Sequence, residues 1–276
     1  MAGIGECVTD GLPLAWRHRC LSYSLEQGGS KDLSMDEVRQ MVGRSFAAWV
    51  AVTCPGSPGF DVRETEALSA CDRAVYNTDS GNVNTVAFVS DWPDRDYDRS
   101  AYALTTVWHN PRTGEIYDVD MELNEMRGRW GNCPTPAGCT DGTIDLQNVV
   151  THEAGHYFGL AHTPDSNIAT MYAMSPPGEV SKRILRTDDI EGFCTAYPPG
   201  SLPDACDYTP RGGLAVKCTD DSCGCRAPGA GRGPGAIGVG VLFVCVLMAR
   251  RRRRTRERQR APSALSVRAH RVLHGE

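Results

Sequence analysis

The fold of this chain is decided by one stretch of sequence, Thr151-His-Glu-Ala-Gly-His-Tyr-Phe-Gly-Leu-Ala-His162. His152 and His156 are four residues apart, so on a helix both imidazoles project from one face, about one turn apart. Two neutral imidazoles at that spacing can bind one Zn²⁺ at about 2.0–2.1 Å each. The stretch therefore predicts a helix that carries a metal site.

The residues that follow predict a third ligand and a base. Gly159 can adopt the left-handed conformation that ends a helix, so the chain can turn back and present His162 to the same metal. Three protein ligands leave a fourth position open to water, as a catalytic site requires. Glu153 lies beside the first ligand, where it can serve as the general base. Chance produces these residues at these spacings at a rate on the order of 10⁻⁸ per position, which argues against ordinary core histidines.

The stretch His152–His162 matches the HExxHxxGxxH zinc signature of the metzincin peptidases, and residues 13–198 resemble the matrixins among them. Met171 stands where that family places its Met-turn, whose methionine packs beneath the zinc; Met174 is the alternative. The resemblance implies an α+β fold with a mixed twisted β-sheet, a long helix, an active-site zinc helix and a small C-terminal subdomain after the zinc motif. It also implies one catalytic Zn²⁺ and hydrolysis of peptide bonds in a polypeptide substrate.

Some features fit the matrixins and others depart from them. Thr163 resembles the small hydroxyl residue that matrixins favour after the third histidine, and Leu185–Ile190 has their Leu-x-x-Asp-Asp-Ile pattern. Matrixins usually hold a second, structural zinc with several histidines. Within the acidic body, residues 1–225, only His18 and His109 are spare, so we do not expect that site.

Local patterns predict the other elements. Ser34 is the predicted N-cap of an amphipathic helix that ends near Trp49, and Asp145 is that of the zinc helix. Period-two alternation between turn residues predicts strands. We expect strands at Leu21–Ser24, Phe60–Arg63, Val83–Val89 and Glu115–Asn124, and a final short helix at Thr187–Tyr197.

The predicted strand Glu115–Asn124 alternates apolar residues with Asp118, Asp120 and Glu122. We expect it to be the edge strand that binds an extended substrate through backbone hydrogen bonds. The three acids could also bind Ca²⁺, although a solvated polar face of the strand is the simpler interpretation.

The twelve cysteines indicate an exported protein, at the cell surface or outside the cell, because cytosolic chains rarely carry so many. Sequential pairing is the simplest hypothesis, although spacing alone cannot fix connectivity and free core cysteines are an alternative. The sequential pairs are Cys7–Cys20, Cys54–Cys71, Cys133–Cys139 and Cys194–Cys206. The first 20 residues contain no apolar run of signal-peptide length, so we expect the export signal in a segment missing from this chain.

Charge separates an acidic body from a basic tail. Residues 1–225 hold 17 basic and 32 acidic side chains, whereas 12 arginines and two acids follow from Arg226 onward. The acidic body argues against a nucleic-acid partner, and the tail indicates a membrane-side signal. The apolar run Ala236–Ala249 is short for a membrane span of about 20 residues, but the arginines Arg250–Arg254 next to it favour a transmembrane helix over a buried core helix.

The tail also resembles the C-terminal sorting signals of myxobacterial surface proteins, through Cys223-Gly-Cys225, the apolar run and the arginines. The resemblance implies membrane or sorting machinery as a partner, and anchoring or processing through the tail. A structural disulfide is the alternative for the two cysteines.

We therefore expect a monomer with four parts: a catalytic domain at 1–200, a Gly/Pro/Cys-rich linker at 201–233, the sorting or membrane segment at 234–254, and a basic disordered tail at 255–276. Two other hypotheses stay open. One is a catalytically silent surface binding or adhesion module that keeps its zinc, and the other is a two-histidine zinc peptidase with a distant glutamate ligand.

Overall fold

The computed structural model describes residues 12–57, 59–164, 166–218 and 268–275, the last of these by their backbone. A six-stranded mixed sheet has the order β2-β1-β3-β5-β4-β8. Parallel pairing joins β2 to β1, β1 to β3 and β3 to β5, whereas β4 is antiparallel to both β5 and β8. The strands are β1 (Cys20–Leu25), β2 (Asp61–Glu64), β3 (Thr85–Val89), β4 (Ala101–His109), β5 (Ile116–Asn124) and β8 (Arg268–Gly275).

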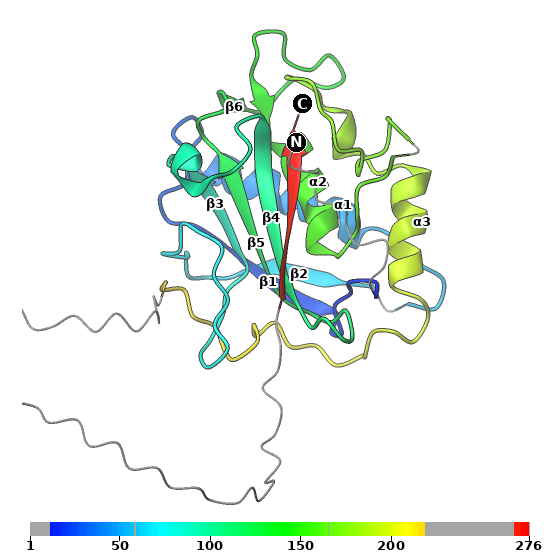
Figure 1. The fold of residues 1–276 in the computed structure, drawn as a ribbon. Helices are drawn as coiled ribbons and strands as arrows, with labels where there is room; N and C mark the ends of the chain where they lie inside the picture. Colours follow the sequence, from blue (N-terminus) through cyan, green and yellow to red (C-terminus); the bar gives the residue numbers. More distant parts are fainter. Residues whose placement is uncertain (1–11, 58, 165, 219–267, 276) are drawn as a thin grey trace, which may run out of the picture. The chain divides into compact units, whose positions relative to one another are not determined.

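Two helices pack against each other and against the sheet: α1 (Met35–Val50) and α2 (Leu146–Tyr157) (Figure 1). Ser34 caps α1 in a capping box with Glu37, and the apolar stripe of α1 is buried, as its spacing predicts. A third helix, α3 (Thr187–Ala196), follows α2 in the chain, and α2 is the predicted zinc helix. The smaller elements are η1 (Trp92–Arg95), η2 (Ser181–Arg183) and the two-residue pair β6 (Trp130–Gly131) and β7 (Ile144–Asp145).

The α+β class and the mixed sheet are confirmed, but the expected edge strand is wrong. The predicted strand Glu115–Asn124 corresponds to β5, which lies inside the sheet between β3 and β4. Strand β4 was not predicted from the sequence, although Ala101–His109 is rich in β-branched and aromatic residues. The strand that packs against α2 is mainly β4, and its second hydrogen-bonding side is paired with the edge strand β8.

The acidic side chains of β5 are buried rather than solvated. Asp118, Asp120 and Glu122 are at most 2% exposed. Asp120 accepts hydrogen bonds from the backbone N–H groups of Val75 (3.0 Å) and Thr85 (2.9 Å). An ion pair with Arg95 holds Glu122. Among the described residues these three acids do not converge as a group of metal ligands. Protein groups are partners of Asp120 and Glu122.

Because Asp118 and Asp120 are buried, their contribution to the stability of the fold depends on pH. Burial raises the pKa of Asp120 to about 8, and burial together with the Asp120 charge raises the pKa of Asp118 well above its usual value. In the unfolded chain both groups titrate near pH 4. The raised pKa values therefore add to the unfolding free energy in full below about pH 4, where the acids are protonated in both states. This added stability decreases above about pH 4, and that of Asp120 is lost as the pH rises through about 8.

Asp118→Asn removes one of these acids with little change in shape. We expect its unfolding free energy to match that of the parent protein near pH 4, and to exceed it near pH 8 by at least about 1 kcal/mol. Urea denaturation across this pH range measures the difference, with the exposed Asp79→Asn as control. Parallel pH curves for the parent and Asp118→Asn would contradict a buried, neutral acid pair.

Sequential cysteine pairing is wrong for three of the four proposed pairs. Only Cys133–Cys139 forms as predicted. The other bonds join segments that are far apart in the sequence and meet only after the chain folds: Cys20–Cys206, Cys54–Cys194 and Cys71–Cys218. Two of these bonds attach residues 201–218, part of the expected linker, to the body of the domain. Cys7 lies outside the described residues.

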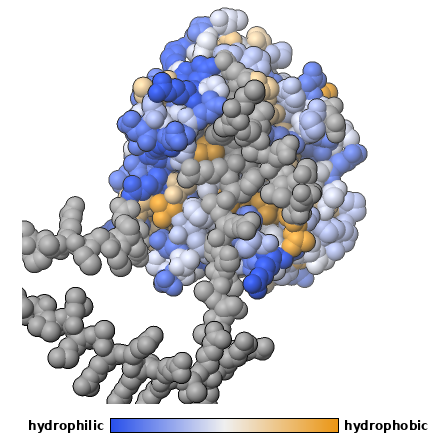
Figure 2. Space-filling model, in the orientation of Figure 1, coloured by the Kyte–Doolittle hydropathy of each residue, from blue (hydrophilic) through white to orange (hydrophobic). Residues whose placement is uncertain are grey.

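In the orientation of Figure 1, the described surface is mainly hydrophilic, with small scattered apolar groups (Figure 2). No helix among the described residues has the length and apolar character needed to cross a membrane. The apolar run Ala236–Ala249, the arginines Arg250–Arg254 and the Cys223–Cys225 motif all lie outside those residues.

Candidate metal centre

The zinc helix α2 is held at both ends by side chains from distant segments. Asp145 caps its N-terminus by accepting the backbone N–H of Asn148 (2.7 Å), as predicted. Three aromatic side chains donate to backbone carbonyls. The Trp49 indole N–H bonds to Thr151 in the middle of the helix (2.8 Å), and the Trp16 indole N–H (2.8 Å) and the Tyr197 hydroxyl (2.7 Å) bond to carbonyls at its C-terminal end. These bonds satisfy buried carbonyls and fix the orientation of the helix.

The three predicted ligands converge. The Nε2 atoms of His152, His156 and His162 lie 3.1, 3.1 and 3.2 Å from one another. His152 and His156 are buried, and His162 is half-buried. The Nδ1 atom of His152 lies 2.6 Å from the Thr170 carbonyl oxygen, and the Nδ1 atom of His156 lies 2.8 Å from that of Leu160. Because a carbonyl can only accept a hydrogen bond, both Nδ1 atoms carry the ring proton.

This arrangement fits a metal ion. With their protons on Nδ1, the rings of His152 and His156 turn lone pairs toward a common point that His162 also faces. Ligands of a tetrahedral Zn²⁺ with bonds of about 2.0–2.1 Å lie about 3.3–3.4 Å apart, close to the separations found here. Among the described residues, no other group of three metal-ligating side chains comes together.

A glycine turn brings His162 to the other two rings. Gly159 has φ of +85°, and the N–H groups of Leu160 and Gly159 bond to the carbonyls of Gly155 (3.0 Å) and His156 (2.9 Å), as in a helix-ending Schellman motif. A Cβ on Gly159 would lie 2.3 Å from the carbonyl oxygen of Leu14. Both the backbone conformation and the space therefore require glycine at this position.

Glu153 is fully buried on α2, next to the first histidine in the chain. Its Oε2 accepts a hydrogen bond from the hydroxyl of Thr105 on β4, whereas its Oε1 has no hydrogen-bond partner among the described residues. Burial raises the pKa of Glu153 to about 8, against the opposing effects of the Thr105 hydrogen bond and the charge of Lys182. One carboxylate oxygen is thus anchored and the other is left for another partner.

Met171 packs under the zinc helix. It is 2% exposed, and a Cβ added to Gly155 would lie 2.1 Å from its sulfur, so the methionine contacts the helix between the first two histidines. The Met171 carbonyl accepts the N–H of Thr163, which ties the turn to the residue after the third histidine. Met174 is 44% exposed and does not occupy this place.

The turn that carries Met171 is held by Asp189 of α3. The two carboxylate oxygens accept the N–H groups of Thr170 (2.9 Å), Met171 (2.9 Å) and Arg186 (2.7 Å). The buried Asp189 carboxylate fixes the backbone of Thr170, and the carbonyl of Thr170 contacts His152. Asp189 therefore helps to position His152 without touching it.

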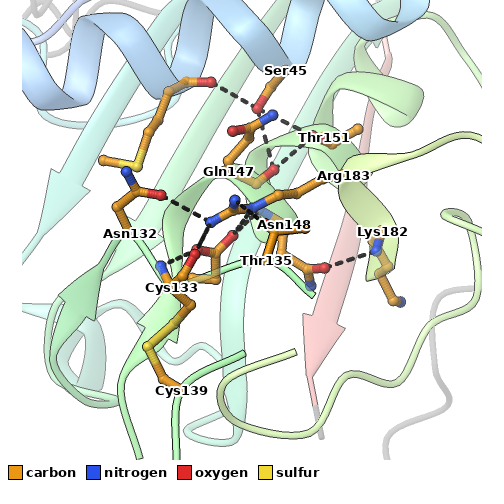
Figure 3. A network of polar contacts seen from close by, with 12 residues as sticks. Ser45, Asn132, Cys133, Thr135, Cys139, Gln147, Asn148, Thr151, Lys182 and Arg183 are labelled. Carbon is orange, nitrogen blue, oxygen red and sulfur yellow. Dashed lines mark hydrogen bonds and ion pairs between the residues drawn. A yellow bond between two sulfur atoms is a disulfide. The ribbon is translucent and has the colours of Figure 1, made fainter. Parts of the chain in front are cut away.

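A second polar network ties η2 to the start of the zinc helix (Figure 3). Arg183 donates to both carboxylate oxygens of Asp145. The backbone N–H of Lys182 donates to Asn148 (2.8 Å), and its buried amine donates to the Tyr172 carbonyl. The loop after the methionine turn is therefore fixed to the same helix as the histidines.

Comparison with known proteins agrees with this geometry. The matrixin family model matches residues 76–198, which include β4, the zinc helix and α3. Residues 76–198 are therefore similar to the matrixins, and this part of the chain contains His152, His156 and His162. It is 26% identical over 212 residues to Matrix metalloproteinase-C of Caenorhabditis elegans, covering 72% of this chain and 33% of that protein.

Two other relatives show the same partial overlap. Metalloendoproteinase 1-MMP of Arabidopsis thaliana is 25% identical over 194 residues, 67% of this chain and 44% of the relative. Neutrophil collagenase of Homo sapiens is 27% identical over 199 residues, 72% of this chain and 36% of the relative. The chain thus spans less than half of the length of each of these relatives.

Several residues around the three histidines were not predicted from the sequence, chiefly Thr105, Asn148, Lys182 and Asp189. Thr105 belongs to the strand that was not predicted. Asp189 lies in the Leu185–Ile190 motif, and its place in the first turn of a predicted helix is the feature of the sequence that could have indicated a structural role. Its role depends on contacts over 18 and 19 residues that no local pattern reveals.

The variant Asp189→Asn tests whether Asp189 holds the turn that carries Met171. An amide has one acceptor oxygen, so at least one of the three N–H groups loses its partner, and we expect a loss of about 1–3 kcal/mol in unfolding free energy. Zinc affinity should also fall about 10–100-fold, because the Thr170 carbonyl that orients His152 is no longer fixed. Chemical denaturation and competition with a zinc-binding dye measure the two effects. Asp188→Asn, at an exposed neighbour in the same helical turn, should change neither; equal effects of the two variants would contradict the role of Asp189.

Proposed function

We propose that this chain is a zinc-dependent endopeptidase. The observation that carries the proposal is the convergence of three imidazole Nε2 atoms beside a buried glutamate with one unpartnered oxygen. His152, His156 and His162 would hold the zinc, and Glu153 would act as the general base. Met171 would form the floor of the site, and Gly159 the turn that delivers the third ligand.

The chemistry follows from these residues. Zinc in such a site supplies a Lewis acid that makes water a nucleophile near neutral pH and polarises the scissile carbonyl. Glu153 uses its free Oε1 to take a proton from the attacking water, and later delivers it to the leaving amine. Thr105 holds the other oxygen, so the carboxylate keeps one orientation through both transfers. The aromatic core around α2 keeps the histidines in place during the reaction.

The substrate is proposed to be an extended polypeptide that pairs with β4. Backbone pairing along an edge strand binds a peptide with little dependence on its side chains. β4 is suited to this because Thr105, in its middle, contacts the catalytic glutamate. A peptide aligned on β4 would therefore pass the reacting groups.

A catalytically silent zinc module is the competing hypothesis. A structural zinc site has no use for a fully buried glutamate with an unpartnered oxygen, and burying such a carboxylate costs stability. The third hypothesis, a distant glutamate as ligand in place of His162, is disfavoured by the position of the His162 Nε2 atom, within 3.2 Å of the other two.

The cellular setting is part of the proposal. The four disulfides between described residues support a location outside the cytosol. The catalytic unit of 1–200 is proposed to extend to Cys218 through its disulfide to Cys71, and residues after α2 to form a small subdomain. The segment 234–254 is proposed to serve sorting or membrane attachment. A monomer is proposed because the site draws only on residues of one chain.

Glu153→Gln tests the mechanism. We expect kcat on an unselected peptide library to fall by about 10²–10⁴-fold, because the amide cannot take the proton. Zinc content should stay near one ion per chain, since Glu153 is not a ligand. The exposed Glu191→Gln serves as the matched control and should keep full activity.

Metal removal completes the test. A chelator should abolish cleavage, and added Zn²⁺ should restore it. His162→Ala should lose both zinc and activity. If Glu153→Gln cleaves at the parent rate, or if chelation leaves cleavage intact, the endopeptidase mechanism is wrong.

A further inference from the structure

The last described segment of the chain occupies the edge of β4. Strand β8 (Arg268–Gly275) pairs antiparallel with β4 over its whole length, with His109 opposite Arg268 and Ala101 opposite Gly275. Figure 1 shows β8 in red beside β4. The edge that would bind a peptide is therefore paired with a strand of the same chain, which lies within the segment expected to be a disordered tail.

The register places β8 at the centre of the site. Val272 is the partner of Thr105, the residue that donates to Glu153. β8 also contacts the zinc helix α2. Adjacent strands lie about 4.8 Å apart, so the backbone of β8 runs one strand spacing from the strand that touches the catalytic glutamate.

We propose that β8 is an autoinhibitory strand that occupies the substrate-binding edge of β4. The inference rests on the proposed function, because it assigns β8 to the place of the substrate. One edge can form one ladder, so the backbone groups of β4 that face β8 are not available to a peptide. Substrate must displace β8 before it can reach Glu153.

Two features of the chain favour this pairing, and the second favours it within one chain over binding in trans. Residues 1–225 carry a net acidic charge, whereas the segment from Arg226 onward is basic and places Arg268 and Arg271 in β8. Covalent connection also gives a tethered strand an effective concentration on the order of millimolar. A short strand with weak intrinsic affinity can therefore hold the edge, and yet leave it when the chain is cut between Cys218 and Arg268.

The test measures peptide binding in a Glu153→Gln background, so that no cleavage interferes. The chain ending at Val267 lacks β8, whereas the matched control ending at Gly275 keeps it. The probe is a fluorescein-labelled synthetic peptide with the sequence of Arg268–Gly275, followed by fluorescence polarisation. We expect binding about five- to fifty-fold tighter to the chain ending at Val267, as competition with a tethered strand requires. Equal affinity for the two chains would overturn the proposal.

Hydrogen exchange gives a second measurement that needs neither zinc nor activity. The β4 amides that face β8 should exchange faster in the chain ending at Val267, and the amides of β1 and β3 should not change. Unchanged exchange along β4 would show that β8 does not pair there, and would overturn the inference.

Val272→Pro in the full chain separates autoinhibition from loss of folding. Proline fixes the backbone φ angle and disfavours strand pairing at the centre of β8, while residues 12–218 keep their sequence. With Glu153 present, we expect peptide cleavage to rise about five- to fifty-fold in this variant and in the chain ending at Val267. If both cleave no faster than the parent although β4 exchanges faster, β8 is a structural strand and the proposal fails. If none of the chains cleaves but the probe binds selectively to the shorter one, the endopeptidase proposal fails while the occupancy of the edge stands.

Discussion

The contacts of His152 and His156 with backbone carbonyls are the constraint on which the site depends. Each contact places a proton on Nδ1 and so turns the Nε2 lone pair toward the third histidine. Without a cation, such convergent lone pairs repel one another, and the surrounding packing must hold them together. The domain can therefore be understood as a scaffold that keeps three imidazole nitrogens in positions that suit one metal ion.

That scaffold comes from segments spread along the whole domain. Trp16 from the N-terminal region, Trp49 from α1 and Tyr197 beyond α3 all donate to carbonyls near or in the zinc helix. Asp189 reaches the helix indirectly through the methionine turn. The disulfide between Cys54 and Cys194 links the segment after α1 to α3. Packing, hydrogen bonding and covalent bonds thus converge on α2, and a change in one segment is transmitted to the ligands.

Local sequence patterns predicted the elements but not how they meet. The spacing of the HExxH helix, the Ser34 cap and the period-two strands depends on near neighbours, and each of these elements is present. The disulfides, the position of β4 between β5 and β8 and the contacts of Asp189 depend on residues far apart in the chain. The acids of β5 alternate as a solvated face would, yet the loop at Val75 and the side chain of Arg95 cover them. Periodicity reports which residues share a face, not what packs on it.

The most direct test of the account is the coordination of zinc in the purified chain, measured by zinc K-edge X-ray absorption together with metal analysis. The account predicts one zinc per chain with three imidazole nitrogens and one light oxygen-type scatterer, at about 2.0–2.1 Å. Sulfur in the first shell, a two-imidazole fit, or zinc well below one ion per chain would contradict the convergence of His152, His156 and His162 on a single metal.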